Sequence, residues 1–313
     1  MAQIGNSELD IFPLVLGGNV FGWTADQATS FAILDAFVDG GGDLIDTADG
    51  YSHWVPGNHG GESETIIGAW MAARHNRDRV LIATKVGTKP DRAGLRAANI
   101  RAAIDDSLTR LATDHVDLYY AHFDDPEVPM AEIIGTLSGL VDAGKVRYIA
   151  PSNFSPARLD EWAAVTAENG WHAAVALQPE YNLMERGFET NGLRDAAQRH
   201  EWGVLPYAGL ASGFLTGKYR PGSEATGARS GRVAKYLGDA RGEAVLGVLN
   251  ELADECGIEP AEAALAWLRA QPGVVAPIAS ASRPDQVASL LVSGRLVLAS
   301  EVVEALTEAS EPR

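Results

Sequence analysis

Cysteine is almost missing from this sequence, and basic residues are scarce. One cysteine, Cys256, among 313 residues cannot form an internal disulfide or a cysteine-based zinc site, which fits a reducing compartment. The 25 Lys and Arg residues against 42 Asp and Glu residues give a formal net charge of −17. Because nucleic-acid-coating proteins and polybasic membrane anchors need a basic face, we expect neither kind of partner.

Long apolar runs are also missing. No run reaches about 18 apolar residues, so no segment is expected to span a bilayer. The opening residues, MAQIGNSELDIF, have neither a basic start nor an apolar core of signal-peptide length, and we expect a cytoplasmic protein. His53, His59, Glu62 and Glu64 lie close together in the sequence, but their spacing matches no standard metal site, so no metal is expected.

The sequence does contain a regular alternation of short β-branched runs and longer stretches of helical periodicity. Near-continuous apolar runs, such as VLIAT at 80–84, are typical of strands covered on both faces. The predicted strands lie at roughly 14–19, 43–46, 79–85, 116–121, 146–150, 174–178, 203–207 and 274–278. The predicted helices lie at 26–39, 62–74, 97–112, 128–143, 155–168, 186–200, 242–256 and 284–292, with further helices at about 259–270 and 299–309.

Eight strands, each followed by a helix, predict a closed (β/α)8 TIM barrel, in one domain spanning residues 1–313. The competing interpretation is an open doubly wound sheet, but no G-x-G-x-x-G follows the first strand. A long loop at about 208–241, polar and rich in glycine, follows the seventh strand. In a barrel, such a loop lies at the catalytic face.

Polar side chains stand where three adjacent predicted strands end. Asp46 ends the second strand, Lys85 the third, His122 follows the fourth, and Tyr51 lies just past Asp46. Each has a plainer interpretation by itself: a cap or turn residue, a rim charge, a core histidine or a packing tyrosine. If these segments are barrel strands, however, an acid, an amine, an imidazole and a phenol meet in one pocket.

A series of short motifs in this order and spacing resembles the aldo-keto reductases along nearly the whole chain. The motifs are DLIDTA at 43–48 followed by Tyr51, GESE at 61–64, ATK at 83–85, SLTRL at 107–111, VDLY at 116–119 followed by His122, SNFS at 152–155, QPEYN at 178–182 and GFLTGKY at 213–219. The family is a (β/α)8 barrel that reduces carbonyls with NADPH, and its bacterial and channel-β-subunit-like branch is the nearest in pattern. The resemblance therefore supports the fold predicted from periodicity.

The resemblance implies a role for each polar residue at the strand ends. Tyr51 would be the general acid, and Lys85 would lower the pKa of its phenol. Asp46 would pair with Lys85, and His122 would orient or hydrogen-bond the carbonyl oxygen. The chemistry explains the residue types, because a phenol with a reference pKa of about 10 donates a proton more easily when an ammonium favours its phenolate.

The resemblance also implies contacts with the nicotinamide half of the cofactor. Ser152, Asn153 and Gln178 match the residues that hold the carboxamide, and both amide side chains can donate and accept. Tyr207 matches the aromatic residue that stacks on the nicotinamide ring. Val20 and Phe21 belong to the first-strand motif that borders the cofactor. The plainer alternative is that the polar members of this set satisfy backbone groups at strand ends.

Further positions match the residues that meet the phosphates. Leu210, Ser212 and Lys218 match the loop across the pyrophosphate, and Arg229 is a weaker phosphate candidate. The adenosine-phosphate segment contains Ser280, Ser282, Arg283 and Gln286. Arg283 is placed to pair with a 2′-phosphate, which favours NADPH (NADP+) and leaves NADH possible. The plainer alternative is that Ser282 caps a helix beginning at Pro284.

Trp23, Trp54 and Phe123 fall on loops after strands, where the resemblance implies a substrate pocket for an apolar or aromatic carbonyl. The alternative is packing of these loops on the barrel. The predicted function is NADPH-dependent reduction of an aldehyde or ketone to an alcohol, or the reverse. The alternatives are a cofactor-binding regulatory subunit on the same scaffold and a different barrel chemistry, such as a sugar-phosphate isomerase. The substrate and the oligomeric state are not readable from sequence.

Overall fold

Parallel strands form a closed ring in the computed structural model, which describes residues 1–220, 223–225 and 230–312. In chain order the ring strands are β3 (Val15–Gly17), β4 (Leu44–Asp46), β5 (Leu81–Val86), β8 (Val116–Ala121), β9 (Val146–Pro151), β10 (Ala176–Leu177), β11 (Gly203–Val204) and β12 (Ile278–Ala279). Six of them pair in the order β12-β3-β4-β5-β8-β9, and β10 pairs with β11. Bridges from Ile149 to Ala174 and from Val204 to Val274 join the two sheets. The predicted (β/α)8 barrel is therefore confirmed.

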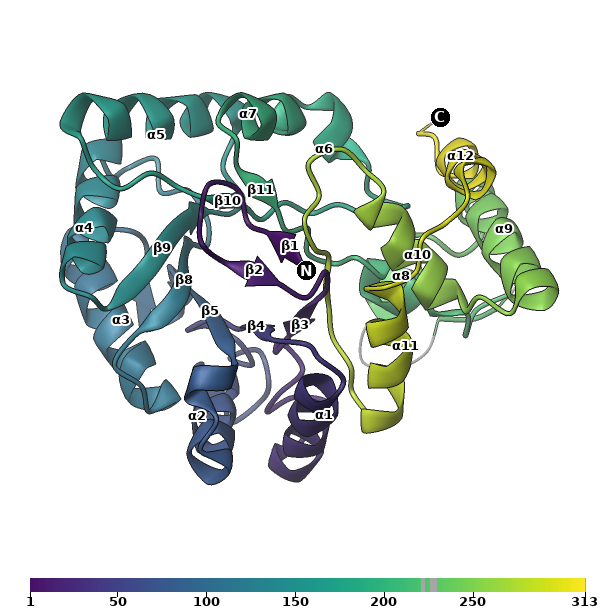
Figure 1. Cartoon of the computed structure of the whole chain (residues 1–313), viewed down its shortest axis with the longest axis horizontal. Coiled ribbons are helices and arrows are strands. Elements are labelled where there is room, and N and C mark those ends of the chain that lie inside the picture. The colour runs from purple at the N-terminus through teal and green to yellow at the C-terminus, as the bar shows by residue number, and fades with distance from the viewer. Residues whose placement is uncertain (221–222, 226–229, 313) are drawn as a thin grey trace.

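Helices surround the ring, as Figure 1 shows. Those beside it are α1 (Gln27–Asp39), α2 (Glu62–Arg74), α3 (Ala97–Leu111), α4 (Met130–Asp142), α5 (Pro156–Asn169), α7 (Leu193–Arg199), α10 (Pro260–Arg269) and α11 (Val287–Ser293). Two more, α9 (Ala240–Cys256) and α12 (Ser300–Ala309), lie side by side at the outer edge. The ring thus takes its last two helices from α10 and α11. None of the described helices combines the length and apolar character that crossing a membrane requires.

Some elements differ from the sequence prediction. The helix predicted at 186–200 is two helices, α6 (Gly187–Thr190) and α7, because Gly192 adopts a left-handed φ of 89° between them and Asn191 Oδ1 accepts a hydrogen bond from the Leu193 amide. The loop predicted at about 208–241 contains a 3-10 turn, η2 (Ala211–Thr216), and a short helix, α8 (Ser230–Val233). Val233 is fully buried, which anchors α8 on the core.

Two hairpins were not predicted, since their strands are only two residues long. The first, β1 (Ala2–Gln3) with β2 (Asp10–Ile11), lies at the end of the barrel where the strands begin. Its Ile4, Leu9 and Ile11 are buried with the barrel interior. The second, β6 (Thr88–Lys89) with β7 (Arg92–Ala93), follows β5 at the opposite end. One end of the barrel is therefore plugged, and the other is built from the loops that follow the strands.

Strand pleating decides which side chains enter the barrel. Successive residues of a strand point to opposite faces. In β4, Leu44 belongs to the apolar cluster inside the ring and Ile45 to the cluster under the helices. In β5, Ala83 lies inside and Ile82 outside. This alternation fixes the direction of the polar residue that ends each of these strands.

Candidate active site

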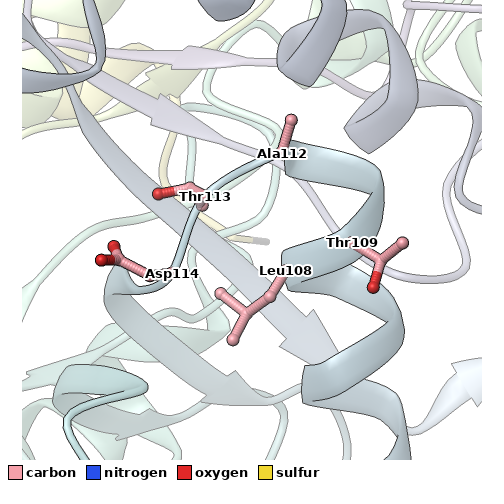
Figure 2. A pocket seen from close by; sticks show the side chains of 5 residues that line it. All are labelled: Leu108, Thr109, Ala112, Thr113 and Asp114. Carbon is pink, nitrogen blue, oxygen red and sulfur yellow. The ribbon is translucent and has the colours of Figure 1, made fainter.

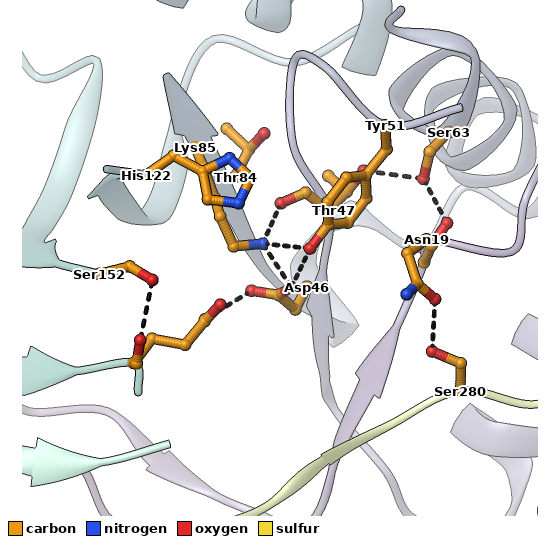
Figure 3. Close-up of polar contacts among 12 residues, drawn as sticks. Asn19, Asp46, Thr47, Tyr51, Ser63, Thr84, Lys85, His122, Ser152 and Ser280 are labelled. Atoms are coloured by element: carbon orange, nitrogen blue, oxygen red, sulfur yellow. Dashed lines mark hydrogen bonds and ion pairs between the residues drawn. The ribbon is translucent and has the colours of Figure 1, made fainter. Parts of the chain in front are cut away.

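Asp46, Lys85 and His122 lie at the same end of the barrel, at or just after the carboxyl ends of β4, β5 and β8. The residues two positions before them all belong to the apolar cluster inside the ring, namely Leu44, Ala83 and Tyr120. Because side chains alternate along a strand, the three polar residues point inward as well. Tyr51, from the loop after β4, folds back over the same end of the barrel (Figure 3).

Lys85 is the centre of a buried hydrogen-bond network. Its Nζ donates to Asp46 Oδ1 at 2.5 Å, to the Thr47 carbonyl at 2.6 Å and to the Tyr51 hydroxyl at 2.9 Å (Figure 3). The Lys85 side chain is 0% exposed and that of Asp46 is 2% exposed. Gln178 Nε2 donates to the second Asp46 oxygen at 3.0 Å. The ammonium therefore has a carboxylate, a carbonyl and a phenol as its three partners.

Burial sets the pKa values of this network. It raises the pKa of the Tyr51 phenol well above its ordinary value, and the Asp46 charge raises it further. Burial also lowers the pKa of the Lys85 ammonium, against the effect of Asp46. The sequence-based expectation was that Lys85 lowers the phenol pKa, but the paired Asp46 charge offsets the ammonium and desolvation dominates. The phenol is consequently protonated at neutral pH.

His122 lies beside the Tyr51 ring, with 6.0 Å between the ring centroids. Burial, aided by the Lys85 charge, lowers the pKa of His122 well below its ordinary value. The imidazole is therefore neutral at neutral pH. Its Nδ1 shares a hydrogen bond with Thr88 Oγ1 at 3.1 Å, which leaves Nε2 to meet a ligand. Sequence reasoning missed Thr88, because nothing in the local pattern placed β6 against His122.

The residues predicted to hold the carboxamide form one connected group. Ser152 Oγ donates to the Gln178 carbonyl at 2.8 Å, and Asn153 Nδ2 donates to Ser152 Oγ at 3.0 Å. The Tyr207 hydroxyl donates to Asn153 Oδ1 at 2.8 Å. Asn153 adopts a left-handed φ of 57°, which turns its side chain back toward this group. Since Gln178 also bonds Asp46, the group is continuous with the Lys85 network.

The turn η2 has an unusual run of left-handed backbone conformations. Ala211, Ser212 and Gly213 have left-handed φ values of 46°, 59° and 95° in succession. The Lys218 ammonium lies against this turn, since a Cβ added at Gly213 would come within 3.4 Å of its Nζ. Turns of this kind gather backbone N–H groups into a concavity suited to anions. Leu210 packs its side chain against the core beside the turn.

The segment predicted to receive the adenosine phosphate is exposed at Arg283 and partly buried at Ser280, Ser282 and Gln286. Gln286 Oε1 accepts hydrogen bonds from the Ser282 amide and hydroxyl and from the Arg283 amide. The idea that Ser282 caps this helix is therefore wrong, because its hydroxyl donates to Gln286 and the cap position of η3 (Pro284–Gln286) is Arg283. Arg283 pairs with Asp285 at 3.1 Å. Arg229 lies outside the described residues.

The first-strand residues differ from the others in burial. The side chains of Val20 and Phe21 are 3% and 0% exposed and belong to the core. Buried to this extent, Val20 and Phe21 offer almost no surface to a cofactor. Beside them, Ser280 Oγ donates to Asn19 Oδ1 at 2.8 Å (Figure 3), which joins the loops after β3 and β12.

Trp23, Trp54 and Phe123 come together around Tyr51 and His122. The Trp23 and Trp54 ring centroids are 5.6 Å apart, and the Tyr51 and Trp54 centroids are 6.3 Å apart. Phe123 packs beside His122 at 5.2 Å. Trp54 is 44% and Phe123 49% exposed, far more than core aromatics. They form an open aromatic wall beside the phenol.

The described residues also form hollows at the surface. A shallow one is lined by Leu108, Thr109, Ala112, Thr113 and Asp114 (Figure 2). It follows α3 and precedes β8, so it lies at the end of the barrel remote from Lys85. A second hollow, of about 260 Å³, is bordered by Asn153 and Tyr207 and therefore belongs to the candidate site. Within the described residues, no group of three or more His, Cys, Asp or Glu side chains is placed to hold a metal ion.

Known proteins with similar sequences agree with this architecture. The model of the Aldo/keto reductase family matches residues 13–311. Protein tas of Escherichia coli is 33% identical, over 96% of this chain and 94% of the relative. Norsolorinic acid reductase B of Aspergillus parasiticus is 31% identical, over 97% of this chain and 82% of the relative. A putative voltage-gated potassium channel subunit beta of Schizosaccharomyces pombe is 32% identical, over 80% and 74%. The chain therefore belongs to the aldo-keto reductase family, whose members are oxidoreductases that typically use NAD(P)H.

Proposed function

We propose that this protein is an NADPH-dependent reductase that converts an aldehyde or ketone to an alcohol, or runs the reverse reaction. The observation that supports this most is the buried contact of the Lys85 ammonium with both Asp46 and the Tyr51 hydroxyl. Few structural roles call for a fully buried lysine whose third partner is a largely buried phenol. A phenol that donates a proton and then bears negative charge, in contrast, needs a buried ammonium beside it.

The proposed chemistry assigns one task to each residue. A bound nicotinamide cofactor supplies the hydride that reaches the carbonyl carbon. Negative charge then grows on the carbonyl oxygen, and Tyr51 donates its proton to that oxygen. Lys85 stabilises the phenolate left on Tyr51, while Asp46 keeps Lys85 charged and in place. The neutral His122 orients the carbonyl oxygen through Nε2.

The residues present fit a nicotinamide dinucleotide. Ser152, Asn153 and Gln178 offer the donors and acceptors that a carboxamide needs, beside the flat ring of Tyr207. The left-handed turn η2 with Lys218 suits a pyrophosphate. Arg283 would exchange its exposed contact with Asp285 for a 2′-phosphate, which is the basis for proposing NADPH rather than NADH.

Replacing Tyr51 with Phe tests the proposal. Because the phenol is the proton donor, we expect kcat to fall about 10²–10⁴-fold, the contribution typical of a general acid. Binding of NADPH, followed by fluorescence titration, should stay unchanged. The matched control is Tyr148→Phe, which removes a hydroxyl that accepts from the Glu8 amide at the other end of the barrel. A Tyr51→Phe enzyme with near-normal kcat would contradict the assignment.

A second candidate function is a cofactor-binding regulatory subunit with little turnover. The similarity to a protein named as a potassium channel subunit beta favours keeping it. NADPH absorbance followed with a panel of aldehydes separates the two, since a regulatory subunit would bind NADPH tightly and oxidise it with none of them. For either function, we propose a single domain over residues 1–313 and a cytoplasmic location.

A further inference from the structure

A second buried polar cluster lies on the outward side of β5, behind Lys85. It contains Asp49 from the loop after β4, Glu64 from α2, Arg110 from α3 and Tyr119 from β8. The side chains of Asp49, Glu64 and Tyr119 are all 0% exposed. The proposed reaction uses none of them.

The cation of this cluster is bonded to Glu64. Glu64 accepts from Arg110 Nε at 2.7 Å and from Thr84 Oγ1 at 2.5 Å, so its charge is compensated. Asp49 is held differently. Its Oδ2 accepts one long hydrogen bond, from the Gly87 amide at 3.4 Å. Its buried Oδ1 and the Tyr119 hydroxyl have no hydrogen-bond partner among the described residues.

Asp49 is nevertheless tied to the reaction centre through its backbone. Its amide donates to the Lys85 carbonyl at 3.1 Å, and it stands two residues before Tyr51 in the same loop. A buried carboxylate without a bonded cation is costly, so the carboxyl favours its neutral form. Burial and the Glu64 charge raise the pKa of Asp49 to about 7, against the smaller opposing effects of the Gly87 and Gly50 amides and of Arg110.

We propose that Asp49 is a positioning residue for the reaction, a carboxyl that keeps its proton up to about neutral pH while its amide holds the Lys85 backbone. Asp46 is then the carboxylate that pairs with the Lys85 ammonium. When Asp49 loses its proton, a second negative charge acts on Lys85. That charge offsets the ammonium that stabilises the phenolate left on Tyr51 after proton donation, so turnover falls. This inference rests on the proposed reductase function.

The groups that face Asp49 come from every element packed against it. Glu64 approaches from α2, Arg110 from α3, Lys85 from β5 and Tyr119 from β8. Removing the Glu64 charge should lower the Asp49 pKa and move any decline in turnover to lower pH. Removing the Tyr119 hydroxyl changes no charge at neutral pH and should leave the decline where it is.

The test compares pH profiles of kcat for the full chain with a reducible aldehyde. The wild type should lose about tenfold between pH 6 and pH 8, the change in protonated fraction for a group with a pKa of about 7. Asp49→Asn, which has the same shape and cannot ionise, should lose less than about twofold. Glu64→Gln should shift the decline to lower pH, and Tyr119→Phe should keep it. A decline that persists unchanged in Asp49→Asn overturns the proposal.

A second measurement does not depend on activity. The carboxyl ¹³C resonance of Asp49 can be identified in ¹³C-aspartate-labelled protein by its absence in Asp49→Asn, and titrated without any carbonyl compound. A midpoint near neutral pH supports the proposal, and one near the ordinary aspartate value overturns it. If Asp49→Asn does not fold, Glu64→Gln tests the same point by moving the midpoint down. A protein that reduces no carbonyl contradicts the proposed function, while this titration still decides whether Asp49 holds a proton.

Discussion

Replacing Lys85 with Met separates the structural role of the Lys85–Asp46 pair from its chemical role. The substitution removes a fully buried ammonium and leaves the Asp46 carboxylate, 2% exposed, without its ion-pair partner. Breaking a buried pair on one side costs about 3–5 kcal/mol, because the remaining charge is uncompensated. We therefore expect Lys85→Met to lower the free energy of unfolding by about this amount.

Adding Asp46→Asn to Lys85→Met should restore part of the lost stability. The second change removes the unpaired charge but keeps an oxygen that accepts from Gln178 Nε2. The double variant should therefore lose less than the sum of the two single variants, with a coupling energy of about 1–3 kcal/mol. Turnover should stay lost, because the phenol has no ammonium beside it.

Urea unfolding followed by tryptophan fluorescence measures these free energies. The control is Lys145→Met, which removes an exposed ion pair with Asp105 and should cost less than about 1 kcal/mol. Strictly additive single costs, or a Lys85→Met protein as stable as the wild type, would refute the buried pair. Recovery of turnover in the double variant would refute the role given to Lys85.

Three more predictions concern the cofactor, the substrate and pH. Arg283→Ala should weaken NADPH binding about tenfold, or about 1.4 kcal/mol, and leave NADH binding unchanged. A fluorescence titration measures both affinities, and equal losses for the two cofactors would exclude a 2′-phosphate contact. Trp54→Ala should lower kcat/KM for an aromatic aldehyde more than for a short aliphatic one, since it removes part of the exposed aromatic wall. Equal losses of kcat/KM for the two aldehydes in the absorbance assay would contradict a role of this wall in substrate recognition. The folded-state pKa of Asp49, about 7, lies above the ordinary value of 3.8, so the native state retains a proton that the unfolded state releases, and stability falls as pH rises through this window. Urea midpoints compared at about pH 5 and pH 7.5 should show a smaller fall in Asp49→Asn than in the wild type, and equal falls would argue against a protonated Asp49.

Periodicity alone located the barrel, because each strand is an apolar run covered on both faces and each helix has an apolar stripe. The prediction from periodicity was wrong where a single residue ends or breaks an element. The predicted helix at 186–200 is broken at Asn191 and Gly192. A periodicity averaged over a whole helix does not detect a break at two residues. The two hairpins escaped prediction because two-residue strands have no periodicity to detect.

The meeting of Asp46, Lys85 and His122 at one end of the barrel was also predictable, since these residues end or follow neighbouring strands and parallel strands present their carboxyl ends together. Their electrostatics were not predictable. The direction of the Tyr51 pKa shift depends on whether burial or the Lys85 charge dominates, and the extent of burial is a property of the tertiary structure.

The sequence by itself determined the order of elements, the alternation of inward and outward side chains and the residues that meet at one end of the barrel. These follow from local rules of pleating and helical period. The tertiary structure alone decided which charges are compensated. Within the part of the chain that the structure describes, Glu64 is bonded to Arg110 and Asp49 to no cation, although both are buried carboxyls. Burial and ion pairing depend on contacts between residues that are far apart in the sequence, and a local sequence pattern does not predict such contacts.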